Sequence, residues 1–266
     1  MRIVSWNINA LRAHEEYFRA AINKLQPDIF CLQEIKVRED QQTFPVKGYR
    51  SFMNPAEQSQ FYGTGVFIKN SLRPLSVLFD RNLPGYDYHG RVVATELQQF
   101  YVVNSYWPFS AYDKEGKWLK YRLAWCRQFQ QFIHELQGRK PVIICGDMNM
   151  VRESGDAFDG VAVKKAGCFY IEEHEAFDKL LQEERLVDSF RALHPLSISQ
   201  MQGSGDYTAW AYSKDNAQRL NNQGFRIDYF LVSECLMESV KSSELLPDII
   251  RSEERRVGKE CRSRWS

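Results

Sequence analysis

The sequence lacks a long hydrophobic run, an internal repeat and an excess of charge of either sign. Nowhere do 18 apolar residues follow one another, and no apolar stretch of secretory length lies near the N-terminus. Neither a membrane span nor a signal peptide is therefore expected. The formal net charge is only +1. Composition alone predicts no nucleic-acid partner, and such a partner would have to meet a local patch of charge.

Cysteines are few and scattered. The six cysteines include no pair at the spacing of metal ligands, and several stand inside apolar runs. In such runs a reduced thiol behaves as a small hydrophobe. We therefore expect a soluble, cytoplasmic protein in a reducing setting, with no membrane partner.

What the chain does have is enough apolar material for a deep core. Hydrophobic residues make up 44% of its 266 residues, which suits one large globular domain. Helical spacing is clearest in the ranges 14–25, 118–136 and 172–184. Strand-like ranges are 2–8, 28–34, 63–69, 75–79, 91–97, 100–107, 140–147, 226–233 and 240–246. This alternation predicts an α/β fold in which mixed sheets pack face to face with helices outside.

Six polar residues stand at or near the ends of these strands, where ligands of layered α/β folds gather. They are Asn7, Glu34, Tyr106, Asp147, Asn149 and Asp228. Each alone also has a structural explanation. Asn7 suits a turn, Tyr106 suits a core aromatic with a tethered hydroxyl, and Arg226 is placed to compensate Asp228 on the same face of a strand.

Together the six residues suit phosphodiester hydrolysis. That reaction needs a hard cation against the phosphate charge, an acceptor that activates water, and donors aimed at the phosphate oxygens. Glu34 offers a carboxylate for Mg²⁺, and Asp147 can orient or deprotonate water. Asn7, Asn149 and Tyr106 supply neutral polar groups. A cation or an acid near the phosphate is missing from this set.

Eight segments, in their order along the chain, resemble the exonuclease III family of abasic-site endonucleases, within the endonuclease/exonuclease/phosphatase superfamily. They are WNINALR, LQEIK, YGTGVF, GRV, CGDMN, VDSFRALHP, YTAW and FRIDYFLVS. The resemblance runs from Met1 to about Ile250. It implies a four-layered α/β sandwich and cleavage of double-stranded DNA 5′ to abasic sites in base excision repair, with Mg²⁺ or alternatively Mn²⁺. A 3′-exonuclease or 3′-phosphatase activity often accompanies that cleavage, and a monomer is expected.

The resemblance also implies a role for each matching residue. Asn7 and Glu34 match metal-site positions, Tyr106 matches a phosphate contact, and Asp147 and Asn149 match the pair that positions water and phosphate. Asp228 matches a carboxylate that orients a catalytic histidine. An apolar pocket for the flipped abasic sugar is matched by Trp210, Phe225 and Ile227. Extruding such a sugar costs little because no base is left to stack.

Some positions depart from the family pattern. Phe109 stands after Pro108 where a small polar amide is usual, so one phosphate donor is in doubt. The larger departure is at the end, where the family closes with Gly-Ser-Asp-His-X-Pro and a last strand. Here Glu254 falls at the place of the catalytic histidine, and the five histidines, which are His14, His89, His134, His174 and His194, all come earlier. We therefore expect greatly reduced activity.

Residues 251–266 hold six basic and three acidic side chains, whereas residues 1–250 carry a net charge of −2. The segment shows neither the alternation of a half-buried strand nor the apolar run of a central one. The sequence thus predicts one domain over residues 1–250 without its last strand, and a foreign or disordered basic tail over 251–266. A natural arm for DNA phosphates is the alternative.

Two other functions stay open at this point. A phosphodiesterase of the same superfamily can act on phosphoinositides, sphingomyelin or poly(A) instead of abasic DNA. A DNA-binding module without turnover is the other alternative, and it would bind abasic DNA tightly without cleaving it.

Overall fold

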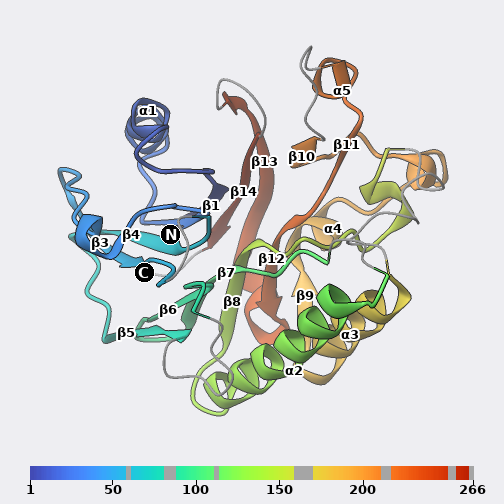
Figure 1. Cartoon of the computed structure of the whole chain (residues 1–266), viewed down its shortest axis with the longest axis horizontal. Helices are drawn as coiled ribbons and strands as arrows, with labels where there is room; N and C mark the ends of the chain where they lie inside the picture. The colour runs from blue at the N-terminus through green and yellow to red at the C-terminus, as the bar shows by residue number, and fades with distance from the viewer. Residues whose placement is uncertain are drawn as a thin grey trace.

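The structure is a computed structural model, and it describes residues 1–57, 61–80, 88–110, 114–158, 170–210, 217–250 and 256–263. Two six-stranded sheets form its centre (Figure 1). The first sheet has the order β13 (Val240–Ile250), β14 (Arg256–Ser263), β1 (Arg2–Asn7), β2 (Ile29–Gln33), β4 (Thr64–Lys69) and β3 (Tyr49–Asn54). The second has the order β5 (Ser76–Phe79), β6 (Val92–Glu96), β7 (Tyr101–Tyr106), β8 (Val142–Asp147), β12 (Asp228–Ser233) and β9 (Leu186–Asp188).

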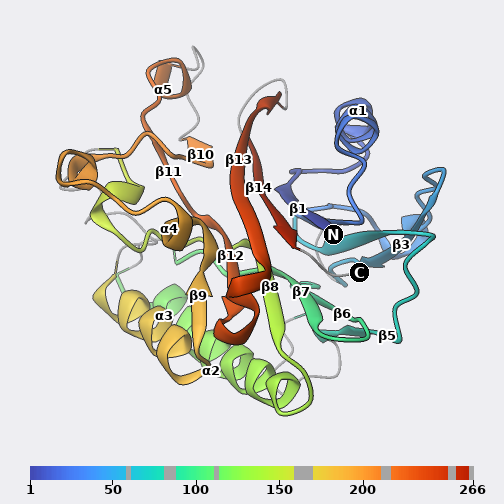
Figure 2. The same cartoon turned by 180° about the vertical axis from the view of Figure 1, so that it is seen from behind.

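The two-residue period of the strands sorts their side chains into layers. On β2, Phe30 and Leu32 face the helix α1 (Glu15–Leu25), while Cys31 faces the other sheet. On β8, Ile144 faces the helices α2 (Lys117–Gln137) and α3 (Ile171–Glu183), while Ile143 faces the first sheet. Figures 1 and 2 show α1 on one side of the sheets and α2 and α3 together on the other. The expected α/β sandwich of four layers is thereby confirmed.

Both sheets are mixed. β1 pairs with β2 in parallel, and β7 pairs with β8 in parallel, whereas β12 runs antiparallel to β8. Parallel neighbours bring their carboxyl ends to one edge of a sheet, and an antiparallel neighbour brings its first residue there. This topology therefore gathers the ends of four strands and the start of a fifth at one edge of the sandwich.

The shorter elements connect these layers. They are α4 (Ser189–Leu193), α5 (Ala217–Leu220), β10 (Ala209–Trp210) and β11 (Gly224–Phe225), with 3-10 turns at Glu39–Gln41, Ser154–Asp156, Ile198–Gln202 and Glu234–Ser239. Asp188 is the N-cap of α4, and its carboxylate accepts hydrogen bonds from the backbone N–H groups of Phe190 and Arg191. Such capping satisfies donors that the first turn of a helix leaves unpaired. None of the helices in the described ranges is long and apolar enough to cross a bilayer.

The C-terminal part of the chain differs from the expectation of a missing last strand. β13 continues to Ile250, and β14 lies between β13 and β1 and pairs antiparallel with both. Glu260 is the partner of Val4 on one side and of Glu244 on the other. Ladder hydrogen bonds are made by the backbone, so a strand can form there without a marked apolar pattern, and it covers edges that would otherwise stay unpaired. That residues 251–266 are foreign to the family stays a prediction.

Candidate active site

The six polar residues predicted from the strand ends stand at the single edge that the topology creates. Asn7 ends β1 and Glu34 follows β2; Tyr106 and Asp147 end β7 and β8. Asn149 comes two residues after β8, and Asp228 begins β12 directly opposite Asp147.

Asn7 joins the two sheets at this edge. Its side-chain amide Nδ2 lies 2.7 Å from Glu34 Oε1 and 2.8 Å from Asp147 Oδ2, and donates to both. The hydroxyl of Tyr106 donates to the same Glu34 Oε1 at 3.1 Å. Four of the six residues, from four different strands or strand ends, thus share one hydrogen-bonded group. Asn7, Tyr106 and Asp147 are buried there.

Asn149 is held close to Asp147 by a local turn. Its backbone N–H donates to Asp147 Oδ1 at 3.0 Å, and its side-chain Nδ2 donates to the backbone oxygen of Trp107 at 2.9 Å. The backbone of Asn149 has a φ of 44°, in the left-handed region. Non-glycine residues in that region cost free energy and cluster at functional sites. Placing this amide beside the Asp147 carboxylate therefore costs the folded chain some stability.

Asp228 lies on the same face as Asp147, because directly opposed residues of an antiparallel pair point to one side. Its backbone N–H donates to Thr208 Oγ1 at 3.2 Å. The side chain of Arg226, considered above as the compensating charge for Asp228, instead pairs with Asp156 and Asp188 at 2.6 and 2.7 Å. Asp228 as a whole residue is 3% exposed, so its carboxylate lies in the buried part of the site.

Lys36 is a cation at this edge that the predicted set did not include. Its Nζ lies 3.0 Å from Glu34 Oε2 and also donates to Asn9 Oδ1. Glu34 and Lys36 have φ angles of 51° and 49°, so the chain after β2 is bent to turn both side chains to one place. The signal in the sequence is the Lys two residues after the Glu in the segment LQEIK.

Arg91 is a second cation that sequence reasoning did not assign. Its Nη1 donates to the backbone oxygen of Tyr106 at 3.2 Å. Its guanidinium lies 5.4 Å from the ring centre of Tyr106 and 4.9 Å from that of Tyr62. Cation–π contacts of this kind fix the orientation of a tyrosine ring. Arg91 therefore helps to orient the Tyr106 hydroxyl toward Glu34. In the sequence Arg91 is the middle residue of the segment GRV.

The site offers hard oxygen donors to a divalent cation. The Glu34 carboxylate is one such donor, with its Oε1 2.7 Å from Asn7 Nδ2, and the side-chain oxygen of Asn7, which accepts the backbone N–H of Asn9, is another. No cluster of three or more His, Cys, Asp or Glu side chains suited to holding a metal ion occurs within the described ranges. Mg²⁺ is commonly held by one or two carboxylates and keeps several waters, so this donor set fits such an ion.

The three residues expected in the sugar pocket lie next to the start of β12. Phe225 and Ile227 belong to one apolar cluster with Val151, Ala157 and Ala209. Trp210 follows Ala209 on β10, which pairs with β11 so that Ala209 stands opposite Phe225. The Ile227 N–H donates to Thr208 Oγ1 at 3.1 Å. The structure thus brings Phe225 and Ile227 together beside Asp228, whereas Trp210 pairs with Gly224 and is not a member of that cluster.

Two of the five histidines make contacts that hold the fold together. The Nε2 of His194 lies 3.0 Å from the backbone oxygen of Ser243, and its ring packs on Phe190. The ring of His89 packs on that of Tyr62 with centroids 4.2 Å apart. Glu254, expected at the place of the catalytic histidine, lies outside the described residues.

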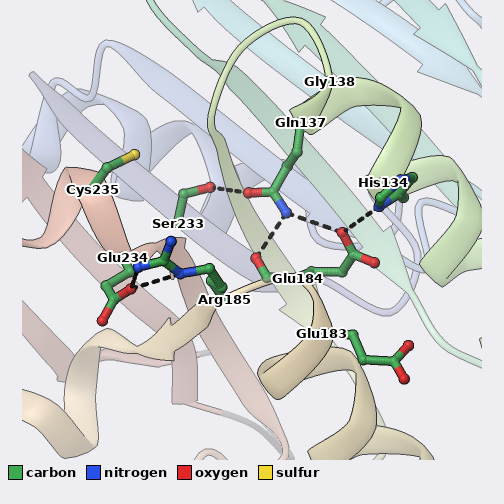
Figure 3. A pocket seen from close by; sticks show the side chains of 9 residues that line it. All are labelled: His134, Gln137, Gly138, Glu183, Glu184, Arg185, Ser233, Glu234 and Cys235. Atoms are coloured by element: carbon green, nitrogen blue, oxygen red, sulfur yellow. Dashed lines mark hydrogen bonds and ion pairs between the residues drawn. The ribbon is translucent and has the colours of Figure 1, made fainter.

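A large pocket lies away from this edge, at the other ends of β8 and β12 (Figure 3). Its volume is about 550 Å³. Ser233, which ends β12 and accepts the N–H of Val142 at the start of β8, lines it. Val142 and Asp147 stand five steps apart along the strand, or about 17 Å. The side chains that line the pocket mostly form hydrogen bonds with one another, as Gln137 does with Ser233 and Glu184. This pocket is therefore not part of the candidate site.

Comparison with known proteins decides which family the chain represents. The profile described as the endonuclease/exonuclease/phosphatase family matches residues 4–251. The chain belongs to this family. An exodeoxyribonuclease of Bacillus subtilis is 34% identical over 255 residues, which cover 95% of this chain and 96% of that protein. A DNA-(apurinic or apyrimidinic site) endonuclease of Dictyostelium discoideum is 36% identical over 91% of this chain and 65% of that protein.

Solved structures of this family share the fold. A 3′ phosphatase, NExo, from Neisseria bound to a product DNA hairpin superposes with a TM-score of 0.85 and 24% identity, and all of both chains is covered. An AP endonuclease from Archaeoglobus fulgidus gives 0.84 and 21%, again over the whole of both chains. The resemblance found in the motifs is confirmed, and so is the enzyme class, a hydrolytic nuclease of the exodeoxyribonuclease and AP endonuclease group. Nucleases of this family generally use a divalent metal ion.

Proposed function

We propose that the chain is a Mg²⁺-dependent DNA phosphodiesterase that cleaves double-stranded DNA 5′ to abasic sites. A 3′-exonuclease or 3′-phosphatase activity accompanies this cleavage, and Mn²⁺ is the alternative metal. The observation that carries the proposal is the bridge from Asn7 to both Glu34 and Asp147. This bridge brings two carboxylates close together. In this proposal Glu34 binds the metal ion and Asp147 acts on water. The names of the relatives at 34–36% identity support DNA and abasic sites as the substrate.

Each residue of the site has a distinct task in this proposal. Glu34 and Asn7 hold the metal ion, which when bound neutralises phosphate charge. Asp147 orients the attacking water and accepts its proton, with its own position fixed by Asn7 and Asn149. Tyr106 and Asn149 donate to the phosphate oxygens, where charge develops in the transition state. Lys36 adds a positive charge next to Glu34.

The sugar pocket and the leaving group complete the proposal. Trp210, Phe225 and Ile227 receive the extruded abasic sugar on an apolar surface. Asp228 suits the task of orienting an imidazole that stabilises the leaving oxygen, but the residue expected there is Glu254. Loss of one electrostatic stabiliser costs about 10²- to 10⁴-fold in rate. We therefore propose that the chain turns over slowly. We also propose that it acts as a monomer and works in the cytoplasm.

The test uses a duplex with one tetrahydrofuran abasic analogue and a 5′ fluorescent label. Cleavage is followed with Mg²⁺, with Mn²⁺ and with EDTA, for the chain itself and for a variant whose residues 251–266 are replaced by the family ending with Ser-Asp-His. We expect a product cut 5′ to the analogue in both metals and none in EDTA. The replaced variant is expected to be faster by about 10²-fold or more.

Glu34→Gln in the replaced variant is the matched control and should abolish the metal response. Equal rates for the two chain ends would refute the proposed impairment. Tight binding of the abasic duplex without cleavage by either chain would favour a binding module. Cleavage of a phosphoinositide, sphingomyelin or poly(A) in place of the duplex would assign the other substrates of the superfamily.

A further inference from the structure

A row of aromatic rings leads from the candidate site to the molecular surface. Tyr106 donates to Glu34 at the inner end. The guanidinium of Arg91 lies over the rings of both Tyr106 and Tyr121, 5.4 and 6.0 Å from their centres. Tyr121 in turn meets the ring of Trp118 edge to face, with centroids 6.3 Å apart. Trp118 stands in the first turn of α2 and is 49% exposed.

Phe109 is a second exposed aromatic residue at the same edge. It follows β7 by three residues and is 50% exposed. The backbone beneath it is fixed, because buried Arg122 donates to the backbone oxygens of Pro108 and Met148. Asn149 also donates to the backbone oxygen of Trp107, two residues before Phe109. The phenyl ring therefore projects from a rigid rim between the ends of β7 and β8.

The chemistry of this rim differs from that of a phosphate contact. A phenyl ring cannot donate a hydrogen bond, so Phe109 does not replace the polar amide usual at this place. Exposed aromatic side chains beside a nucleic-acid site serve in other proteins as stacking platforms for unpaired bases. Flat rings bind nucleobases by stacking, and they do so whatever the base because every base has a π-face. Bases inside a duplex are already stacked and out of reach, whereas unpaired bases are available.

We propose that Phe109 and Trp118 form a stacking site for an unpaired nucleobase next to the scissile phosphate. The occupant is a single-stranded DNA segment that continues from the phosphate at Glu34, such as a frayed or overhanging 3′ end. Continuity with the candidate site and the cationic Arg91 in the row support this occupant. The inference rests on the proposed function and refines its substrate to DNA with unpaired bases beside the cleaved bond.

The test measures stacking without cleavage. A hairpin duplex carries 2-aminopurine in a three-nucleotide 3′ overhang, and fluorescence is titrated with protein in Ca²⁺ or EDTA. Stacking quenches this base. We expect quenching by the unaltered chain, and about a 10-fold loss of affinity for the overhang in Phe109→Ala and in Trp118→Ala. Trp118→Phe keeps a ring and should keep most of the quenching.

Two controls make the result specific. Tyr17→Ala removes an aromatic side chain of similar exposure on α1, over the first sheet, and should change nothing. A blunt duplex should bind all variants within about 2-fold of each other, because it offers no unpaired base. Thermal unfolding of each variant checks that the exposed substitutions leave the fold intact.

The outcomes separate this inference from the proposed function. Quenching that survives in the Phe109→Ala, Trp118→Ala double variant overturns the stacking site, whatever the cleavage assay shows. An equal loss of affinity for blunt and overhanging DNA also overturns it, because it indicates a general DNA contact. Loss of quenching in the two variants, with no cleavage of any DNA by the chain, supports the stacking site while the proposed hydrolysis fails.

Discussion

Asn7 is the residue on which the candidate site depends most. Its side-chain amide has two hydrogens, and each is used by a carboxylate from a different sheet. Two carboxylates so close together would repel each other, and the shared donor offsets part of that repulsion. The amide oxygen stays directed toward the turn, where it accepts the N–H of Asn9 at 3.2 Å. An aspartate at this position would bring a third negative charge and lose the bridge.

The first prediction concerns the Tyr106 hydroxyl. Tyr106→Phe removes the donor to Glu34 Oε1 and keeps the ring, which packs against Arg91. We expect about a 10-fold lower rate of abasic-site cleavage, which corresponds to about 1.4 kcal/mol, within the range for one hydrogen bond. Single-turnover kinetics measure this, with Tyr17→Phe as the control for an exposed tyrosine. An unchanged rate would leave Tyr106 as only a core aromatic.

The second prediction concerns the charge of Lys36. The ammonium group lies 3.0 Å from Glu34 Oε2, so it competes with a divalent cation for that carboxylate. Lys36→Met removes the competing charge and keeps much of the aliphatic stem. We expect the Mg²⁺ concentration for half-maximal rate to fall by several-fold, since like charges near one site repel. A magnesium titration of the variant with the family ending measures this shift, and a higher requirement would refute the idea of competition.

At the residue scale, the sequence identified the polar types but not their partners. Glu34, Asp147 and Asn149 were predictable because carboxylates and amides at the ends of buried strands have few other uses. The pairing of Lys36 with Glu34 depends on positive φ angles at both residues, and no periodic pattern predicts those angles. Arg226 shows the same limit: its sequence neighbour Asp228 suggested a pair, while its actual partners are 38 and 70 residues away.

At the scale of elements, a buried ionic group fixes the chain that carries the sugar pocket. Arg226 pairs with Asp156 of a 3-10 turn and with Asp188, which caps α4, and Arg191 of α4 also pairs with Asp156. Arg226 stands between Phe225 and Ile227. Because the guanidinium is fully buried, removing one partner would leave an uncompensated charge. The group therefore sets where the two apolar side chains lie.

The third prediction is a pH dependence of stability that comes from Asp156. Burial is the largest influence on the pKa of this carboxyl and raises it, but Arg226 and Arg191 together outweigh burial, so the pKa lies below its usual value. The unfolded chain then binds the proton first as pH falls. The stabilisation is complete above about pH 4 and is lost on acidification through the lowered folded-state pKa.

Urea unfolding of the chain and of Asp156→Asn between about pH 3 and 7 isolates this contribution. At pH 7 the variant should be less stable by about 3–5 kcal/mol, the usual cost of breaking a buried pair. The difference should shrink as pH falls, because the unfolded carboxyl takes up its proton at a higher pH than the native one does. A difference that is constant over the whole range would show that folding does not lower the pKa of Asp156.

The fourth prediction tests whether β14 belongs to the sheet. Glu260 faces Val4 on β1 and Glu244 on β13, so a proline there removes a ladder hydrogen bond inside a central strand. Glu260→Pro should lower stability by on the order of 3 kcal/mol, whereas Glu260→Ala, which keeps the backbone donor, should change it little. Urea unfolding compares the two. Equal stability would instead agree with the disordered tail expected from the sequence.

Elements with a strong period were predictable, and elements defined by their surroundings were not. The three long helices begin and end within one residue of the ranges expected from apolar spacing. The sequence patterns did not predict the strands β3 and β9 or the helix α4. β9 has three residues and α4 has five, too few to show a period, and β3 is an edge strand whose exposed residues weaken the pattern.

At the scale of the whole molecule, the site is a product of how the two sheets face each other. β1 and β2 bring Asn7 and Glu34 from the first sheet, and β7, β8 and β12 bring Tyr106, Asp147 and Asp228 from the second. The interior between the sheets is apolar, with Ile3, Ile143 and Phe230 among its members. This common core fixes the distance between the two halves, which the hydrogen bonds from Asn7 to Asp147 and from Tyr106 to Glu34 span.

The fifth prediction is that a single chain is the complete catalytic unit. Every candidate residue comes from one chain, and the hydrogen bonds that join them connect strands of that chain. Sedimentation should therefore give a mass near 31.2 kDa at all protein concentrations, and scattering should give a radius of gyration of about 18 Å. The cleavage rate per mole of enzyme should not depend on enzyme concentration.

Mixing Glu34→Gln with Tyr106→Phe should give only the sum of the two separate rates, because no site can be rebuilt from two chains. A rate above that sum, or a mass twice as large, would mean that a second copy contributes residues to the site.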